Sequence, residues 1–324
     1  DEERVRMVRH PLEVPELTLR RGFFPLGFPV ELRTNRVEVM RVAEEAWGVF
    51  EERFDTEAIA VDVHVTESET KECPPGPTYS IVQPLVVSFA DAQNYCIADL
   101  SRGRTQMVVS EAALRHELYF RYFFLESAAA SHIATSFTTP VHGACVALNG
   151  RGVLLCGESG AGKSTLAYAC ARAGWQYVTD DASLVLHDTP TLTAIGNCHQ
   201  VRLRPSAAEI FPEIQGIEMT PRAAGKPSIE LPTAGRAGFV QAESAEVRAL
   251  VFLNRKDEGE PRLVRYPKDH AWRYLRGTLF GPPEAVAVQS RTIDRLLSVD
   301  VLEMRYTELD WAMERLGTLL EEGQ

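Results

Sequence analysis

The sequence predicts an α/β protein with two parts, an α+β module over residues 1–125 and an α/β domain over residues 126–324. The glycine-rich segment GESGAGKS (157–164) lies between a short apolar run, GVLLC, and a helical pattern, KSTLAYACARAG. From about residue 140 onward, apolar runs and helical patterns follow in the order of an α/β unit. Before residue 125, several strand patterns follow one another, with helical patterns on either side.

Composition excludes several classes of function. The 324 residues are 45% apolar, which is enough for a large buried core. The formal net charge of −11 argues against binding to nucleic acid or to an anionic membrane. No window approaches about 18 consecutive apolar residues, and the first residues lack the apolar segment of a secretory signal, so we expect a cytoplasmic protein. The six cysteines are scattered without a CxxC pair, and we expect no structural zinc.

The first module is predicted from periodicity and turn residues. Helical spacing of apolar residues predicts a helix over 35–54, and alternation predicts a strand over 58–65. A Pro/Gly cluster at 72–79 interrupts regular structure. Strands are expected within 79–90, 94–100 and 105–110, and a long buried helix over 110–135 with Ser110 as its N-cap.

The segment 157–164 fits the pattern GxxxxGK[ST] without a mismatch. Its glycines allow backbone N–H groups to surround phosphate oxygens, and the following helix N-terminus adds a favourable dipole. Lys163 is expected to reach the β- and γ-phosphates, and the Ser164 hydroxyl to coordinate Mg²⁺. The predicted nucleotide-binding residues are Gly157, Glu158, Ser159, Gly160, Ala161, Gly162, Lys163, Ser164 and Thr165.

Two adjacent aspartates, Asp180 and Asp181, end the next predicted strand, WQYVTDD (175–181). Ligands of open α/β sheets bind at the carboxyl ends of strands. One carboxylate can hold Mg²⁺ and the other can accept a proton from an attacking hydroxyl. The alternative interpretation is that one aspartate caps the next segment or pairs with a surface lysine.

Residues 141–186 resemble the catalytic core of bacterial HPr kinase/phosphorylase, a P-loop kinase fold related to phosphoenolpyruvate carboxykinase. The resemblance rests on His142-Gly143 ahead of a strand, the glycine-rich loop, and the paired aspartates at comparable spacing. It implies phosphorylation of a serine hydroxyl, with His142 near the phosphates, Asp181 as general base and Asp180 on the metal side. It also implies assembly into a homo-oligomer.

The family signature that follows, an acidic residue leading into Arg-Gly-Leu-Gly, is not found in 187–240. The chain therefore looks like a member of an HPr-kinase-related branch whose substrates are various or unassigned, and the resemblance does not extend to reversible phosphorylation of HPr. Cations that can replace the signature are Arg202, Arg204, Lys226 and Arg236, of which Arg204 and Lys226 are preferred. Glu209 or Glu230 can replace its acidic residue, and the sequence does not choose between them.

The remaining elements complete the domain. A strand is predicted over 248–255, a helix within 265–283, and a helix followed by a strand within 284–306. The pattern of residues 307–322 predicts an amphipathic helix, whose apolar stripe packs in the core or forms a docking surface. The aromatic segment 270–280 is a candidate oligomer interface.

These observations predict an ATP- and Mg²⁺-dependent kinase that phosphorylates a hydroxyl, with the serine of a small protein, a peptide or free serine as acceptor. No nucleic-acid or membrane partner is expected, and residues 1–125 are a candidate docking module. The alternative is an ATP-binding or ATP-hydrolysing switch without an acceptor. A third interpretation, a carboxykinase-like activity on a small acid, needs additional metal ligands that the sequence does not offer.

Overall fold

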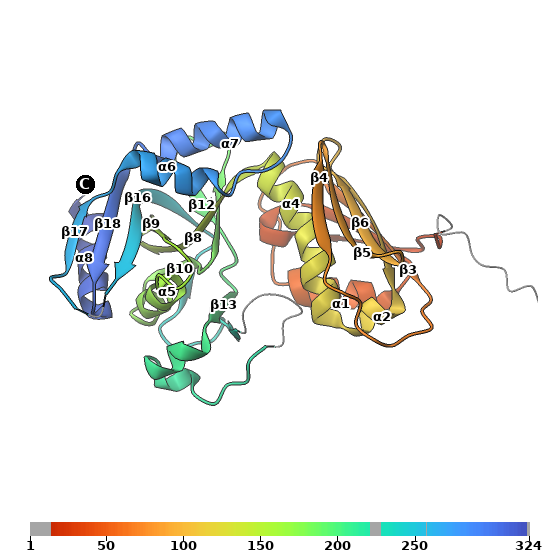
Figure 1. The fold of residues 1–324 in the computed structure, drawn as a ribbon, viewed down its shortest axis with the longest axis horizontal. Helices are drawn as coiled ribbons and strands as arrows, with labels where there is room; N and C mark the ends of the chain where they lie inside the picture. The colour runs from red at the N-terminus through yellow and green to blue at the C-terminus, as the bar shows by residue number, and fades with distance from the viewer. Residues whose placement is uncertain (1–13, 221–227, 257, 323–324) are drawn as a thin grey trace, which may run out of the picture. The chain divides into compact units, whose positions relative to one another are not determined.

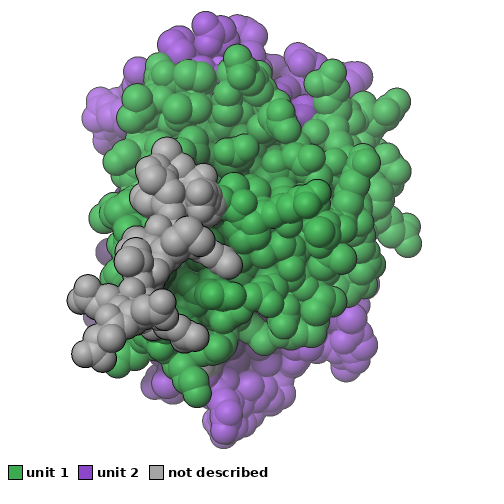
Figure 2. All heavy atoms as spheres, turned by 90° about the vertical axis from the view of Figure 1, so that its right-hand side faces the viewer, with its two compact units in different colours: residues 1–133 green, residues 134–324 purple. Residues whose placement is uncertain are grey.

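The structure, a computed structural model, describes residues 14–220, 228–256 and 258–322 (Figure 1). The chain divides into two compact units, residues 1–133 and residues 134–324, which Figure 2 distinguishes by colour. The division falls within helix α4 (Glu126–Ser136), later in the chain than the expected boundary after residue 125.

Unit 1 is built on one mixed sheet of seven strands in the order β1-β2-β3-β7-β6-β5-β4. The pairs β2–β3 and β3–β7 are parallel, and the other pairs are antiparallel. Alternate residues of β3 supply the core, where Val61, Val63 and Val65 are fully buried. The elements are β1 (Leu19–Phe23), η1 (Pro25–Gly27), β2 (Val30–Thr34), α1 (Val37–Trp47), β3 (Ile59–Thr66), β4 (Thr78–Val82), β5 (Leu85–Asp91), β6 (Asn94–Asp99), β7 (Arg104–Ser110), α2 (Glu111–Arg115), α3 (Glu117–Phe120), η2 (Arg121–Leu125) and α4.

Three predictions for unit 1 need correction. The helix expected over 35–54 is shorter and ends at Trp47 before Gly48. The strand pattern over 79–90 is a hairpin, because Gln83-Pro84 forms the turn between β4 and β5. The long helix expected over 110–135 begins as predicted, with Ser110 Oγ accepting a hydrogen bond from Ala113 N–H, but it is broken at His116.

The break at His116 has a tertiary cause that helical periodicity does not record. The residue leaves the helical region, with φ −95° and ψ 71°, and its ring Nε2 lies 3.1 Å from the carbonyl oxygen of Lys71. A π-helical turn, η2, then joins α3 to α4.

Unit 2 is a nine-stranded mixed sheet with helices on both faces. The hydrogen-bonded order is β15-β10-β8-β11-β12-β16-β18-β17, and β9 pairs with both β8 and β16. Figure 1 shows α5 on one side of these strands and α6 and α7 on the other. The elements are β8 (Thr138–Leu148), β9 (Arg151–Cys156), α5 (Lys163–Arg172), β10 (Gln176–Thr179), β11 (Ala182–Leu186), β12 (Thr193–Ile195), β13 (Gln200–Leu203), η3 (Pro205–Glu209), η4 (Pro212–Ile214), β14 (Ile229–Pro232), β15 (Val240–Gln241), β16 (Ser244–Arg255), β17 (Arg262–Arg265), α6 (Lys268–Arg276), α7 (Pro283–Leu296), β18 (Asp300–Tyr306) and α8 (Leu309–Glu322).

Strand β9 is buried on both faces, which explains its continuous apolar sequence. Val153 and Leu155 join a core cluster with residues of α5 and α8, whereas Leu154 and Cys156 join a second cluster with residues of α6 and α7. The strand that leads into the glycine-rich loop is therefore the centre of a three-layer helix/sheet/helix arrangement.

The C-terminal helices are mainly structural. Leu316 and Leu320 of α8 are buried in the first cluster, so the predicted apolar stripe is core. Helix α6 buries Ala271 and Leu275, while Trp272 keeps 37% of its surface exposed. No helix of the described residues is long and apolar enough to cross a membrane.

We predict a pH-dependent stability that originates at His132, which is fully buried in unit 1 with its Nε2 2.8 Å from Thr105 Oγ1. Burial lowers the pKa of this imidazole from 6.5 to about 4. The unfolded chain binds this proton more readily, so stability is fully present above about pH 6.5 and falls as the pH drops toward about pH 4. At about 1.4 kcal/mol per pH unit, the loss amounts to about 3 kcal/mol.

Urea unfolding of the wild type and of His132→Gln at several pH values between about 7 and 4 measures this loss. The stability of the wild type should decline relative to the variant, which cannot titrate at this position. Parallel pH profiles for the two proteins would contradict the assignment.

Candidate functional site

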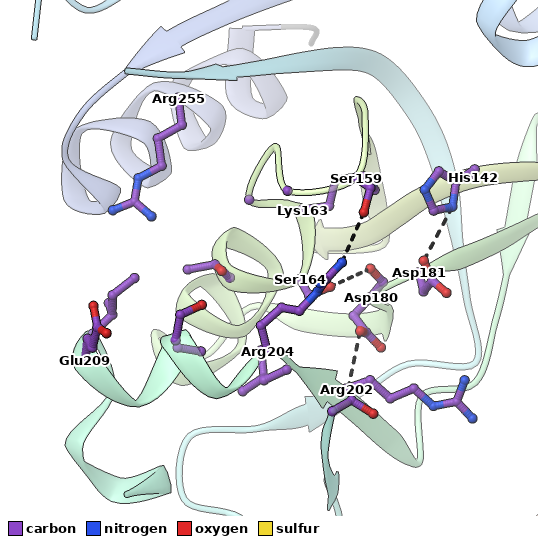
Figure 3. Close-up of a pocket in the computed structure, with 18 residues that line it drawn as sticks. His142, Ser159, Lys163, Ser164, Asp180, Asp181, Arg202, Arg204, Glu209 and Arg255 are labelled. Atoms are coloured by element: carbon purple, nitrogen blue, oxygen red, sulfur yellow. Dashed lines mark hydrogen bonds and ion pairs between the residues drawn. The ribbon is translucent and has the colours of Figure 1, made fainter. Parts of the chain in front are cut away.

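A cavity of about 810 Å³ opens beside the glycine-rich loop of unit 2 (Figure 3). Its size lies within the range of about 300–1,000 Å³ that is usual for small-molecule sites. The polar residues that line it come from six separate segments of the chain: His142, Ser159, Lys163, Ser164, Thr165, Asp180, Asp181, Arg202, Arg204, Ser206, Glu209, Ser228 and Arg255.

The loop from residue 157 to residue 162 connects β9 to α5 and requires glycine at both ends. Gly157 has φ 141°, and a Cβ there would lie 2.9 Å from the Cβ of Ala161. Gly162, the N-cap of α5, has φ 96°, and a Cβ there would lie 3.0 Å from the hydroxyl of Tyr306. These constraints hold the loop tightly against the N-terminus of α5, where a helix presents free N–H groups.

Lys163 is held inside the loop. Its side chain is buried, and its Nζ donates hydrogen bonds to the carbonyl oxygens of Gly157 (2.6 Å) and Glu158 (3.2 Å). Burial lowers the pKa of this ammonium group, while the negative charge of Asp181 opposes the shift. Because an ammonium group has three N–H donors, one remains for an anion in the cavity.

Strand β8 brings His142 to both the loop and the aspartates. On one side Gly143 pairs with Cys156, the residue before the loop, and on the other side Ala182 pairs with His142. The second pairing places Asp181 next to His142, and His142 Nδ1 lies 3.4 Å from Asp181 Oδ1. Both side chains are about half exposed, at 44% and 57%, so a second molecule can reach them.

The two adjacent aspartates occupy different environments. Asp180 is buried, accepts hydrogen bonds from the Tyr177 hydroxyl (2.9 Å) and the Arg202 N–H (3.3 Å), and burial raises its pKa to about 6. Ser164 Oγ donates to the Asp180 carbonyl oxygen at 3.3 Å. Asp181, in contrast, projects its carboxylate into the exposed part of the cavity beside His142 (Figure 3).

Oxygen atoms suited to a divalent cation are present at this point. The described residues hold no cluster of three or more His, Cys, Asp and Glu side chains able to bind a metal. Mg²⁺, however, is usually bound through one or two carboxylates together with phosphate oxygens and water. Ser164 and Asp180 both line the cavity and carry oxygen atoms of this kind, and the Asp180 carboxylate accepts hydrogen bonds from Tyr177 and from the Arg202 N–H.

Of the two cations that the sequence favours, the structure describes one. Arg204 Nη2 donates a hydrogen bond to Ser159 Oγ at 3.0 Å, which brings its charge to the loop. Lys226 lies outside the described residues. Arg202 lines the cavity, but its Nε lies 3.3 Å from Glu230 Oε1, the residue that it faces across the β13–β14 pair.

The remaining charged residues that the sequence offered differ in whether they line the cavity. Glu209 lines the cavity, whereas Glu230 is buried against Arg202 and does not line it. Arg236 also lies away from the cavity lining, and its guanidinium donates to the Pro232 carbonyl oxygen and the Tyr168 hydroxyl.

Within the loop, Gly157, Glu158 and Ala161 do not line the cavity, while the other predicted nucleotide-binding residues do.

Sequence reasoning missed two residues of the site, Tyr274 and Arg255. The Tyr274 hydroxyl accepts from the Gly157 N–H (3.1 Å) and lies within donating distance of two carbonyl oxygens, that of His142 (2.5 Å) and that of Gly157 (2.9 Å). Nothing in the sequence near Tyr274 signals this role. Arg255 is the last residue of a strand that the sequence predicts. Because ligands bind at the carboxyl ends of strands in α/β sheets, its position could have identified it as a site residue.

Comparisons with known proteins show partial similarity. The family model described as SynChlorMet cassette protein ScmC matches residues 124–198, which include β8, β9, the glycine-rich loop, α5, β10 and β11. Among solved structures, the Hpr(Ser) kinase/phosphatase from Coxiella burnetii is similar at 13% identity and a TM-score of 0.30, covering 57% of this chain and 95% of that chain. At these values the similarity carries no argument about function. No curated protein matches the chain.

We predict that Tyr274→Phe loosens the start of the loop. The change leaves the Gly157 N–H without its acceptor, which costs about 1–3 kcal/mol locally. Hydrogen exchange at the Gly157 amide should accelerate by about tenfold or more in the variant.

Tyr266→Phe is the matched control, because the Tyr266 hydroxyl makes no hydrogen bond with any described residue while its ring stacks on Phe252. That variant should leave exchange in the loop unchanged. Equal protection of Gly157 in the wild type and in Tyr274→Phe would refute the role given to the hydroxyl.

Proposed function

We propose that this protein is an ATP- and Mg²⁺-dependent kinase that transfers the γ-phosphate to a hydroxyl, with serine as the acceptor residue. The observation that carries the proposal is the exposed His142–Asp181 pair, which lines the same cavity as Lys163 and the glycine-rich loop. The resemblance of residues 141–186 to HPr kinase/phosphorylase supports the same reaction. The acceptor is a serine of a small protein or peptide, or free serine.

Asp181 is the general base of the proposed reaction. Its carboxylate is accessible, and its Oδ1 lies 3.4 Å from Nδ1 of the neighbouring His142. As the acceptor oxygen bonds to the γ-phosphorus, its proton moves to an Asp181 oxygen, and the bond between the γ-phosphorus and the bridging oxygen of ADP breaks. The exposure of Asp181 leaves room for the acceptor hydroxyl at this side of the cavity.

Lys163 and Arg204 supply the positive charge for the transferred phosphate. Lys163 is fixed by two loop carbonyls, and Arg204 is fixed by Ser159, so little side-chain order must be gained on binding. Cations held in place before the reaction stabilise the transition state without reorganisation at the moment of transfer.

Asp180 and Ser164 are the proposed magnesium ligands. Bound Mg²⁺ would neutralise charge on the phosphate oxygens. Asp180 is suited to a fixed role because the Tyr177 hydroxyl and the Arg202 N–H orient its carboxylate. Its neighbour Asp181 has no such restraint from the backbone and is suited to proton transfer.

The proposal is tested with purified protein, γ-labelled ATP, Mg²⁺ and lysate of the source organism, with separation of protein-sized from small labelled products. We predict label on a serine hydroxyl, and a loss of rate by about 10²- to 10⁴-fold in Asp181→Asn. Asp294→Asn is the matched control, because Asp294 is an exposed carboxylate of α7 outside the cavity lining.

Two other results would contradict the proposal. If ATP is bound and hydrolysed without labelling any lysate fraction, and Asp181→Asn hydrolyses it as fast as the wild type, the protein is a nucleotide-dependent switch. If the wild type binds no ATP, the assignment of the loop to a nucleotide fails.

A further inference from the structure

Arg255 occupies a position at which α/β proteins bind ligands. It is the last residue of β16, which pairs in parallel with β9 so that Phe252 lies opposite Cys156. Arg255 therefore stands beyond the point where β9 enters the glycine-rich loop. Ligands of α/β sheets bind at this carboxyl end of the strands.

The guanidinium of Arg255 is uncompensated. Within residues 14–220, 228–256 and 258–322, no ion pair or hydrogen bond to it is present. Its stem lies close to the loop, since its Cδ would be 3.8 Å from a Cβ placed on Gly162. The other cations of the cavity have partners, because Ser159 holds Arg204, loop carbonyls hold Lys163 and Glu230 lies beside Arg202. Within the part of the chain that the structure describes, Arg255 differs from them in having its whole donor set free.

The cavity has two distinct sides, and Arg255 lies on the side away from the proposed chemistry. Figure 3 shows Arg255 and Glu209 on one side of the loop and the His142–Asp181 pair on the other. The apolar part of the lining next to η3 comes mainly from Ile210, which is half-buried, beside Ala207, which keeps only 3% of its surface exposed. Thr165, in the first turn of α5, also lines the cavity.

The proposed function determines how a nucleoside triphosphate would lie between the two sides of the cavity. If the γ-phosphate lies near Lys163 and Asp181, the nucleoside must extend toward the opposite side of the cavity. That side offers a planar guanidinium and an apolar surface, which together suit a flat aromatic base. A small anion would need the guanidinium but would gain nothing from Ala207 and Ile210.

We propose that Arg255 and the apolar surface of Ala207 and Ile210 form the subsite for the nucleoside portion of the nucleotide. The guanidinium contacts the base and ribose, and the apolar side chains cover the other face of the base. This assignment rests on the proposed function, since it takes its orientation from the site of phosphate transfer.

Binding of MgATP, MgADP and inorganic tripolyphosphate to the full chain tests the subsite by calorimetry. Arg255→Ala should weaken the binding of MgATP and MgADP by about tenfold and leave tripolyphosphate binding unchanged. Arg255→Lys should recover only part of the loss, because an ammonium group lacks the planar fork. Arg265→Ala, which removes an exposed arginine of β17 outside the cavity lining, is the matched control and should bind all three ligands as the wild type does.

Each contrary result has a distinct meaning. If Arg255→Ala weakens tripolyphosphate as strongly as MgATP, Arg255 contacts phosphates and the nucleoside subsite is wrong. If the variant binds MgATP as tightly as the wild type, Arg255 has no role in the site. A wild-type protein that binds neither MgATP nor tripolyphosphate overturns the proposed function itself, and the subsite with it. An unchanged unfolding temperature of the variant shows that the effect is local.

Discussion

The candidate site depends on the register of β8. This single strand pairs with β9 along Gly143–Leu148 and with β11 along Thr138–His142, so it fixes the loop and the aspartates relative to one residue, His142. A shift of the pairing by one residue would turn every side chain of the strand to the opposite face. The buried residues of β8 on both faces of the sheet prevent such a shift, because Ala144 and Cys145 belong to different core clusters. The geometry of the cavity is thus a consequence of how the core packs.

Sequence reasoning could predict the parts of the site that consist of residues close together in the chain. The spacing of Gly157, Gly162 and Lys163, the apolar strand before them and the helix after them lie within about twenty residues and need no long-range information. The position of the paired aspartates after a strand was equally local. Which aspartate is buried was not predictable, because that depends on Tyr177 and on the β13 backbone reaching Asp180.

The parts that could not be predicted involve residues brought together from distant segments. Tyr274 contacts residue 157 only because α6 packs on the sheet face formed by Leu154 and Cys156. The break of the predicted helix at His116 likewise follows from a contact with a distant loop carbonyl. Periodicity identifies which face of an element is buried, but it does not identify the residue on the other side of the contact.

The Tyr274 hydroxyl has one proton and two carbonyl acceptors, so it can serve only one of them at a time. A carbonyl oxygen has two lone pairs, so the Gly157 carbonyl can accept from Lys163 Nζ and from the Tyr274 hydroxyl, and the His142 carbonyl competes for the same hydroxyl proton. The Tyr274 oxygen also accepts from the Gly157 N–H, so a single phenol of α6 ties the end of β9 to the neighbouring strand β8 where both strands reach the cavity.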